Sequence, residues 1–181
     1  MRKATRIGYL EAHGTGTPLG DPVEVNGMKM ALRDLYREAG LAEPTEAHCG
    51  IGSAKSNIGH LELAAGIGGA IKVLLQLQHK MLAKSLHCER PNPYIQLQGS
   101  PLYLVDRTQP WPAPLDAQGR VLPRRAGVSS FGFGGANAHV AFEEYLGTAT
   151  AAAVMPDTGP QLVGRRAAPP PSRRAGSSSP S

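Results

Sequence analysis

The chain has 181 residues, of which 41% are hydrophobic, enough for one globular domain with a core of its own. Its formal net charge is +5, and four arginines between positions 165 and 174 carry most of it. The rest of the chain is therefore close to neutral, which argues against a nucleic-acid-binding protein.

Two cysteines, Cys49 and Cys88, lack the CxxC spacing of a metal or redox site and fit free thiols in a reducing compartment. The basic N-terminus has no apolar run typical of a signal peptide, and no window is apolar enough to span a membrane. We therefore expect a soluble, cytoplasmic protein that contacts neither nucleic acid nor membrane.

The first predicted elements are a strand over residues 7–12, the loop HGTGTPLGD and a helix. Asp21 is a suitable N-cap, Pro22 suits the first helical position, and Glu24 stands where a capping box places its acidic residue. Gly40 is the expected stop. Apolar residues recur at helical spacing and define the inner face: Val25, Met28, Leu32, Leu35, Tyr36 and Ala39.

The next unit is a strand over residues 51–54, a polar turn that contains Lys55, and a helix over residues 61–80 with His60 at its start. This helix is apolar or small nearly all the way round, so we expect it inside a domain. Its three glycines at 66–69 cost about 1 kcal/mol each relative to alanine. Close approach of another backbone would explain them.

Beyond Lys80 the chain is extended and rich in proline, and Trp111 is expected to pack over a core edge. The remaining predicted elements are strands at 102–105, 125–130 and 139–144 and a turn at 116–119. The last strand alternates as a half-buried strand does. Two strand–loop–helix units followed by strands indicate a layered α/β domain over residues 1–146, with a disordered Pro/Ala/Ser/Arg-rich tail over 147–181.

Three segments carry chemistry: His13 with the turn after it, the stretch from Lys55 to His60, and the glycine-rich loop 131–137. Strand ends in α/β folds are where sites are built. A zinc site from His13, His60 and His139 would need ligand spacing that the chain lacks, so no metal is expected. Phosphate binding by the glycines lacks both GxGxxG and a P-loop. These residues alone predict an α/β domain with a two-histidine site.

In combination, the segments EAHGTGTPLGDPVE, GSAKSNIGHLELAAG and GVSSFGFGGANAHV resemble, in this order, the C-terminal half of the β-ketoacyl synthase (ketosynthase) domain. The resemblance is greatest to type I modular polyketide synthases and covers about residues 7–145. It implies a thiolase-like α/β fold, in which a mixed sheet packs on a buried central helix, here residues 61–80.

The resemblance implies that His13, His60, Lys55 and Phe133 are catalytic. Phe133 matches the gating phenylalanine, whose backbone N–H forms half of the oxyanion hole for the acyl thioester. The reaction is a decarboxylative Claisen condensation of an acyl thioester with malonyl-acyl carrier protein. Two neutral imidazoles suit it, because loss of CO₂ places negative charge on a thioester oxygen that fixed donors stabilise. A helix N-terminus is expected to favour neutral His60.

The resemblance also implies residues that bind or support. Thr15, Thr17 and Asn137 match substrate-binding positions, the threonines as hydroxyls that contact the phosphopantetheine arm of the carrier protein. Glu62 and Asn57 match supporting positions, and Glu62 is a candidate ion-pair partner of Lys55. No cofactor is expected to bind directly, because the substrates arrive on acyl carrier protein.

The nucleophilic cysteine of the family lies in an N-terminal half, and neither Cys49 nor Cys88 matches it. We therefore expect an acyltransferase fragment that is inactive alone, exposes apolar surface, and needs the N-terminal half in a homodimer. One alternative is a non-catalytic truncated remnant or docking piece. Another is a thiolase, which would show a second catalytic cysteine near the C-terminal glycine loop.

Overall fold

The computed structural model describes residues 7–147. Apart from Gly147, the predicted tail lies outside the described residues. Residues 7–146 belong to one compact unit that ends at Leu146. Its elements, in chain order, are β1 (Ile7–Glu11), α1 (Gly20–Glu38), β2 (Cys49–Gly52), α2 (Lys55–Ile58), a 3₁₀ turn (Glu62–Ala64), α3 (Ala65–His79), β3 (Met81–Leu82), β4 (Leu102–Leu104), β5 (Gln109–Pro110), β6 (Arg125–Phe131) and β7 (Asn137–Glu143).

Five strands form a mixed sheet in the order β4-β2-β1-β6-β7. The first four are parallel, and only β7 pairs antiparallel, as a hairpin with β6. Two short strands, β3 and β5, form a separate antiparallel pair. The prediction of a mixed α/β sheet is confirmed. The three central strands, β2, β1 and β6, all end at the same edge of the sheet.

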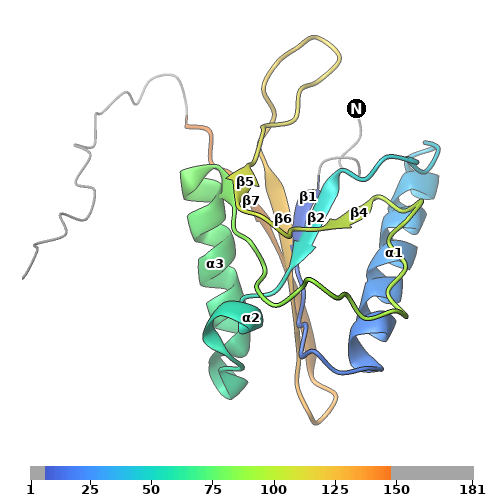
Figure 1. The fold of residues 1–181 in the computed structure, drawn as a ribbon. Coiled ribbons are helices and arrows are strands. Elements are labelled where there is room, and N and C mark those ends of the chain that lie inside the picture. The colour runs from blue at the N-terminus through green and yellow to red at the C-terminus, as the bar shows by residue number, and fades with distance from the viewer. Residues whose placement is uncertain (1–6, 148–181) are drawn as a thin grey trace, which may run out of the picture. The chain divides into compact units, whose positions relative to one another are not determined.

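The helices α1 and α3 lie on opposite sides of the sheet (Figure 1). Because side chains alternate across a strand, neighbouring residues of β1 serve different layers. Tyr9 is buried with Val73 and Leu77 of α3, whereas Leu10 is buried with Met28 and Leu32 of α1. The helical spacing read from the sequence of α1 therefore selected the correct inner face.

The glycines of α3 meet side chains, not another backbone as expected: Gly66 and Gly69 face side chains of the sheet, and Gly68 faces Leu61 and Ile58. A Cβ at Gly66 would lie 3.1 Å from Ser130 Oγ, and one at Gly69 would lie 3.1 Å from Glu11 Cγ and 3.3 Å from a Val128 methyl. The small residues allow α3 to lie close to β1 and β6. The helix thereby comes near the strand ends that carry the predicted histidines.

The opposite face of α3 is exposed, so the expectation of a helix buried all round is wrong for this chain. Ile67 is 61% exposed, and Ile71, Leu74 and Leu75 are each about half exposed. These residues form a contiguous face because they are three or four positions apart. The expectation that the chain exposes apolar surface is confirmed.

Strand β7 is exposed almost throughout, which corrects its prediction as a half-buried strand. Val140 is 50% exposed, and Phe142 alone within the strand is partly buried. The reason is its position at the sheet edge, since α3 packs over β6 and β1 and leaves β7 largely uncovered. Trp111, by contrast, packs as predicted: it is 4% exposed and lies edge-on to Tyr9. Among the described helices, none is long and apolar enough to cross a membrane.

Candidate active site

The candidate site lies where β2, β1 and β6 end. His13 follows β1, Lys55 and His60 follow β2, and Phe131 is the last residue of β6. Adjacent parallel strands bring their carboxyl ends to one edge, so residues far apart in the sequence converge there. The topology thus brings together two of the three segments that carry chemistry, and the third begins beside them.

The rings of His13 and His60 lie side by side. Their centroids are 5.5 Å apart and their planes meet at 84°. Phe131 is the first residue of the glycine-rich loop, and the centroid of its ring lies 5.3 Å from that of the His13 ring. The structure therefore brings the two predicted histidines together beside this loop.

Backbone hydrogen bonds determine which ring nitrogen of each histidine is free. The N–H of Phe131 donates to His13 Nδ1 over 3.3 Å, and the N–H of Glu62 donates to His60 Nδ1 over 2.8 Å. A ring nitrogen that accepts carries no proton, so each neutral ring holds its proton on Nε2. Both imidazoles consequently present an Nε2–H donor.

The pKa of His13 lies below its ordinary value, chiefly because burial disfavours the imidazolium. The positive charge of Lys55 lowers it further, as does that of His60 whenever its ring is protonated, and Asp21 opposes them. The lowered pKa favours the neutral ring, which can still donate a hydrogen bond through its Nε2–H. Lys55 in turn has a lowered pKa, again mainly from burial, against which Glu11, Glu24 and Asp21 act.

We expect an NMR titration of the His13 ring to show a midpoint below 6.5. Because the folded pKa is depressed, the stability contributed by neutral His13 is present above pH 6.5 and is lost as the pH falls through the lowered pKa. Lys55→Met should raise the midpoint by removing a nearby positive charge, and Lys80→Met should leave it unchanged. A midpoint at or above 6.5 in the unchanged chain would contradict this prediction.

Glu11 anchors the same strand end from within the core. It is 2% exposed, and its Oε2 accepts from the Tyr9 hydroxyl at 2.7 Å and from Lys72 Nζ at 2.8 Å. Its Oε1 accepts the backbone N–H of Ala54 at 2.5 Å. The carboxylate therefore joins β1, α3 and the residue that precedes Lys55. The ion pair considered between Lys55 and Glu62 is absent from the described residues, and Lys72–Glu11 takes its place.

Glu24 does not close a capping box, which corrects the sequence prediction. The N-cap position of α1 is Leu19, and no side chain caps it. Glu24 instead accepts the backbone N–H of His13 on Oε1 at 2.7 Å and that of Gly14 on Oε2 at 2.9 Å. Asp21, the expected cap, accepts the N–H of Gly16 at 3.1 Å. Both carboxylates therefore hold the loop before the helix.

In the described part of the chain, the side chains of several predicted site residues bond to neither ring of the histidine pair. Phe133 is fully exposed on the β6–β7 loop, so Phe131 and not Phe133 contacts His13. Asn137 is exposed at the start of β7. Asn57 and Glu62 are also exposed, and Glu62 contributes its backbone N–H to His60, not its carboxylate.

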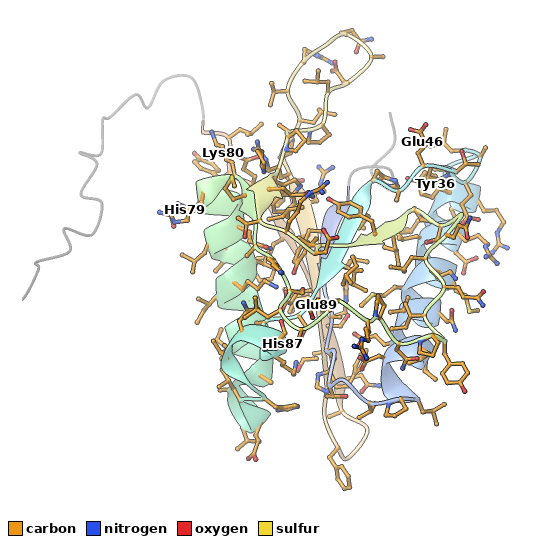
Figure 2. All side chains as sticks on the ribbon, in the orientation of Figure 1. Tyr36, Glu46, His79, Lys80, His87 and Glu89 are labelled. Atoms are coloured by element: carbon orange, nitrogen blue, oxygen red, sulfur yellow. The ribbon has the colours of Figure 1, made fainter. Side chains whose placement is uncertain are left out.

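A groove of about 630 Å³ opens beside the site. It lies between the turn after His13 and the segment 85–97, which Asn92 ties to that turn by donating to Pro18 O at 2.9 Å. Lys55 and Thr15 line the groove, whereas Thr17 uses its hydroxyl to accept the N–H of Gly20. Figure 2 shows His87 and Glu89 on this segment and, in contrast, His79 and Lys80 at the far end of α3.

Comparison with known protein families identifies the chain. The family model described as "Beta-ketoacyl synthase, C-terminal domain" matches residues 2–89, and the model described as "Ketoacyl-synthetase C-terminal extension" matches residues 91–168. The residues that these two models match belong to the β-ketoacyl synthase family. The match to the C-terminal extension continues into the segment predicted as a tail, most of which lies outside the described residues.

Polyketide synthases are similar to this ketosynthase chain. Polyketide synthase PksN of Bacillus subtilis (strain 168) is 61% identical over 140 residues, which cover 77% of this chain and 3% of PksN. Polyketide synthase ThaG of Burkholderia thailandensis is 47% identical over 164 residues, 90% of this chain and 3% of ThaG. The chain thus spans a small part of these relatives' length.

A solved ketosynthase structure gives the fold. The oxazolomycin ketosynthase domain OzmH KS7 of Streptomyces albus JA3453 is 48% identical and matches with a TM-score of 0.73, over 81% of this chain and 24% of that one. The predicted thiolase-like ketosynthase fold is confirmed. The chain spans about a quarter of that domain's length, so the activity of a whole ketosynthase does not follow from the likeness.

Neither cysteine of this ketosynthase chain is suited to accept an acyl group. Cys49 is fully buried in β2, and burial raises the pKa of its thiol far above the ordinary range. The pKa of Cys88 is also raised, by burial and by Glu89. A nucleophilic cysteine needs a lowered pKa and access to its substrate. Among the described residues, no group of three or more His, Cys, Asp or Glu side chains is placed to hold a metal ion.

Proposed function

We propose that this chain supplies the decarboxylation donors of a β-ketoacyl synthase that acts in polyketide or fatty acid biosynthesis. The observation that carries the proposal is the pair of imidazoles, 5.5 Å apart, whose Nδ1 atoms are both occupied as acceptors. Two Nε2–H donors at one strand edge suit an oxyanion that develops on a single substrate oxygen.

In the proposed reaction, a malonyl thioester on acyl carrier protein loses CO₂. The electrons of the broken C–C bond form an enolate, whose negative charge rests on the thioester oxygen. His13 and His60 donate to that oxygen, and Lys55 adds positive charge nearby. The enolate carbon then attacks the acyl thioester carbon and releases the thiolate that carried the acyl chain. The backbone N–H of Phe133 is assigned to the oxyanion hole of this second step.

The partners follow from the chemistry. Malonyl and acyl groups of this class travel on the phosphopantetheine arm of acyl carrier protein, and we assign Thr15, Thr17 and Asn137 to binding it. The acyl-accepting cysteine must come from a ketosynthase region that this chain lacks, since Cys49 and Cys88 are unsuitable. We propose that this region packs against the chain in a homodimer of complete domains. The exposed apolar face of α3 supports such packing.

The test replaces the matching segment of PksN with residues of this chain, which share 61% identity with it. We expect the chimera to decarboxylate malonyl-acyl carrier protein and to form a β-ketoacyl product, detected by mass spectrometry. A chimera that folds, loads an acyl group on its cysteine and still fails to decarboxylate would support the alternative of a non-catalytic remnant.

The 181-residue chain by itself is expected to give no condensation product, because it offers no reactive cysteine. The same mass-spectrometric assay, run with acyl- and malonyl-carrier protein, measures this directly. The chimera serves as the positive control. Product formed by the purified chain alone would show that the assignment of a missing nucleophile is wrong.

A further inference from the structure

The turn that carries His13 has little regular structure to hold it. The N–H of Ala12 still pairs with Gly52 O at 2.8 Å, but the sheet pairing of β1 ends at Glu11. Gly14 has a φ of +50°, a left-handed conformation that turns the chain sharply. The N–H groups of His13 and Gly14 thus need an acceptor from outside the sheet.

Glu24 meets this need with one carboxylate oxygen for each N–H. Oε1 lies 2.7 Å from the nitrogen of His13, and Oε2 lies 2.9 Å from that of Gly14. Hydrogen bonds to an ionised acceptor are shorter and stronger than neutral ones. Two such bonds to consecutive residues fix both the position and the direction of the backbone at the histidine.

The support behind Glu24 is rigid. It lies near the start of α1, between Pro22 and Val25, both of which are buried. The carboxylate is itself half-buried, and burial raises its pKa even though the two N–H groups and Lys55 act in the opposite direction. The fold therefore accepts a cost for keeping an ionised group at this place. A cost of that kind is typical of a group retained for function.

We propose that Glu24 is a positioning residue that holds the backbone of His13 so that its ring meets His60 and the first residue of the glycine-rich loop. The proposal rests on the proposed function of the histidine pair, which it deepens. Glu24 borders the groove beside the site, but both of its carboxylate oxygens bond to the backbone N–H groups of His13 and Gly14, so we assign it a role through His13. Displacing a catalytic group by about 1 Å can cost on the order of 100-fold in rate, so loss of the carboxylate should reduce decarboxylation by about that factor.

The first experiment uses NMR on the full 181-residue chain. Glu24→Gln replaces one acceptor oxygen by an NH₂ group, which faces a backbone N–H and cannot accept from it. We expect faster hydrogen exchange of the His13 and Gly14 amides and a shifted His13 ring resonance. Glu38→Gln, an exposed change on the same helix, should alter neither. Glu24→Asp keeps the charge on a shorter side chain and should give an intermediate effect.

The second experiment measures rates in the PksN chimera described above. Glu24→Gln should lower kcat for decarboxylation about 100-fold and leave acyl loading of the cysteine and the thermal midpoint of unfolding near those of the unchanged chimera. The proposal would be overturned if the Glu24→Gln chimera decarboxylated at the rate of the unchanged chimera. It would also be overturned if Glu24→Gln left the hydrogen exchange of the His13 and Gly14 amides unchanged in the chain. If the unchanged chimera fails to decarboxylate, the proposed function falls, and the amide exchange still decides the role of Glu24.

Discussion

Replacing His60 with alanine is expected to lower the rate of malonyl decarboxylation by about two to three orders of magnitude. That factor, on the order of 3 kcal/mol, is typical for loss of one fixed donor to an oxyanion. His60 is suited to this role because Glu62 N–H occupies its Nδ1 and leaves Nε2–H as the donor. His13→Ala should have a similar effect, because His13 is held in the same way by Phe131. The measurement is release of CO₂ from malonyl-acyl carrier protein by the PksN chimera.

The matched control is His79→Ala. His79 is exposed at the C-terminal end of α3 (Figure 2), whereas His60 precedes the helix's N-terminal end. Its loss should leave the rate within about twofold, since it contacts neither ring of the pair. If His60→Ala and His79→Ala gave the same small decrease, the imidazole pair would not be the donor of the reaction.

The second large effect concerns stability. Lys72→Met is expected to lower the free energy of unfolding by about 3–5 kcal/mol, because it leaves a buried carboxylate without its counter-charge. Glu11 is 2% exposed, and Lys72 Nζ lies 2.8 Å from its Oε2. The Tyr9 hydroxyl and the Ala54 N–H also bond to Glu11 but carry no full positive charge. Urea denaturation of the purified chain measures the loss.

Two further variants separate the ion pair from other effects of the substitution. Lys80→Met removes an exposed lysine next to the end of α3 and should change stability by less than about 0.5 kcal/mol. Lys72→Met combined with Glu11→Gln should recover part of the loss, since no ionised group then remains unpaired. If Lys72→Met alone lowered the free energy of unfolding by less than about 1 kcal/mol, the Lys72–Glu11 pair would contribute no more than a weak surface salt bridge.

Residue pattern predicted much of the local structure. Apolar spacing identified the inner face of α1, and Val25, Met28, Leu32 and Tyr36 are buried as expected. The five strands of the main sheet were predicted within about two residues of their observed ends, because alternation and glycine-rich turns are local signals, whereas the two-residue strands β3 and β5 were not predicted. The family resemblance, carried by three segments in a fixed order, named the histidines that the sheet then brings together.

Tertiary structure decided which partners the polar residues find. Glu24 reads as a capping residue because the local pattern at Asp21 and Pro22 fits one, yet the His13 loop lies closer to its carboxylate. Phe131, to which the resemblance assigns no role, contacts His13. Such choices depend on which segments the sheet order places side by side, and no spacing along the chain encodes that order.

By itself, the sequence determined the α/β class, the elements and the two histidines, because each depends on short-range periodicity or on a motif of fixed order. Only the tertiary structure decided that Glu11 pairs with Lys72, that Glu24 holds the His13 backbone and that one face of α3 is exposed. These features arise from contacts between residues up to 61 positions apart, and their geometry exists only once β1, β2 and β6 are assembled.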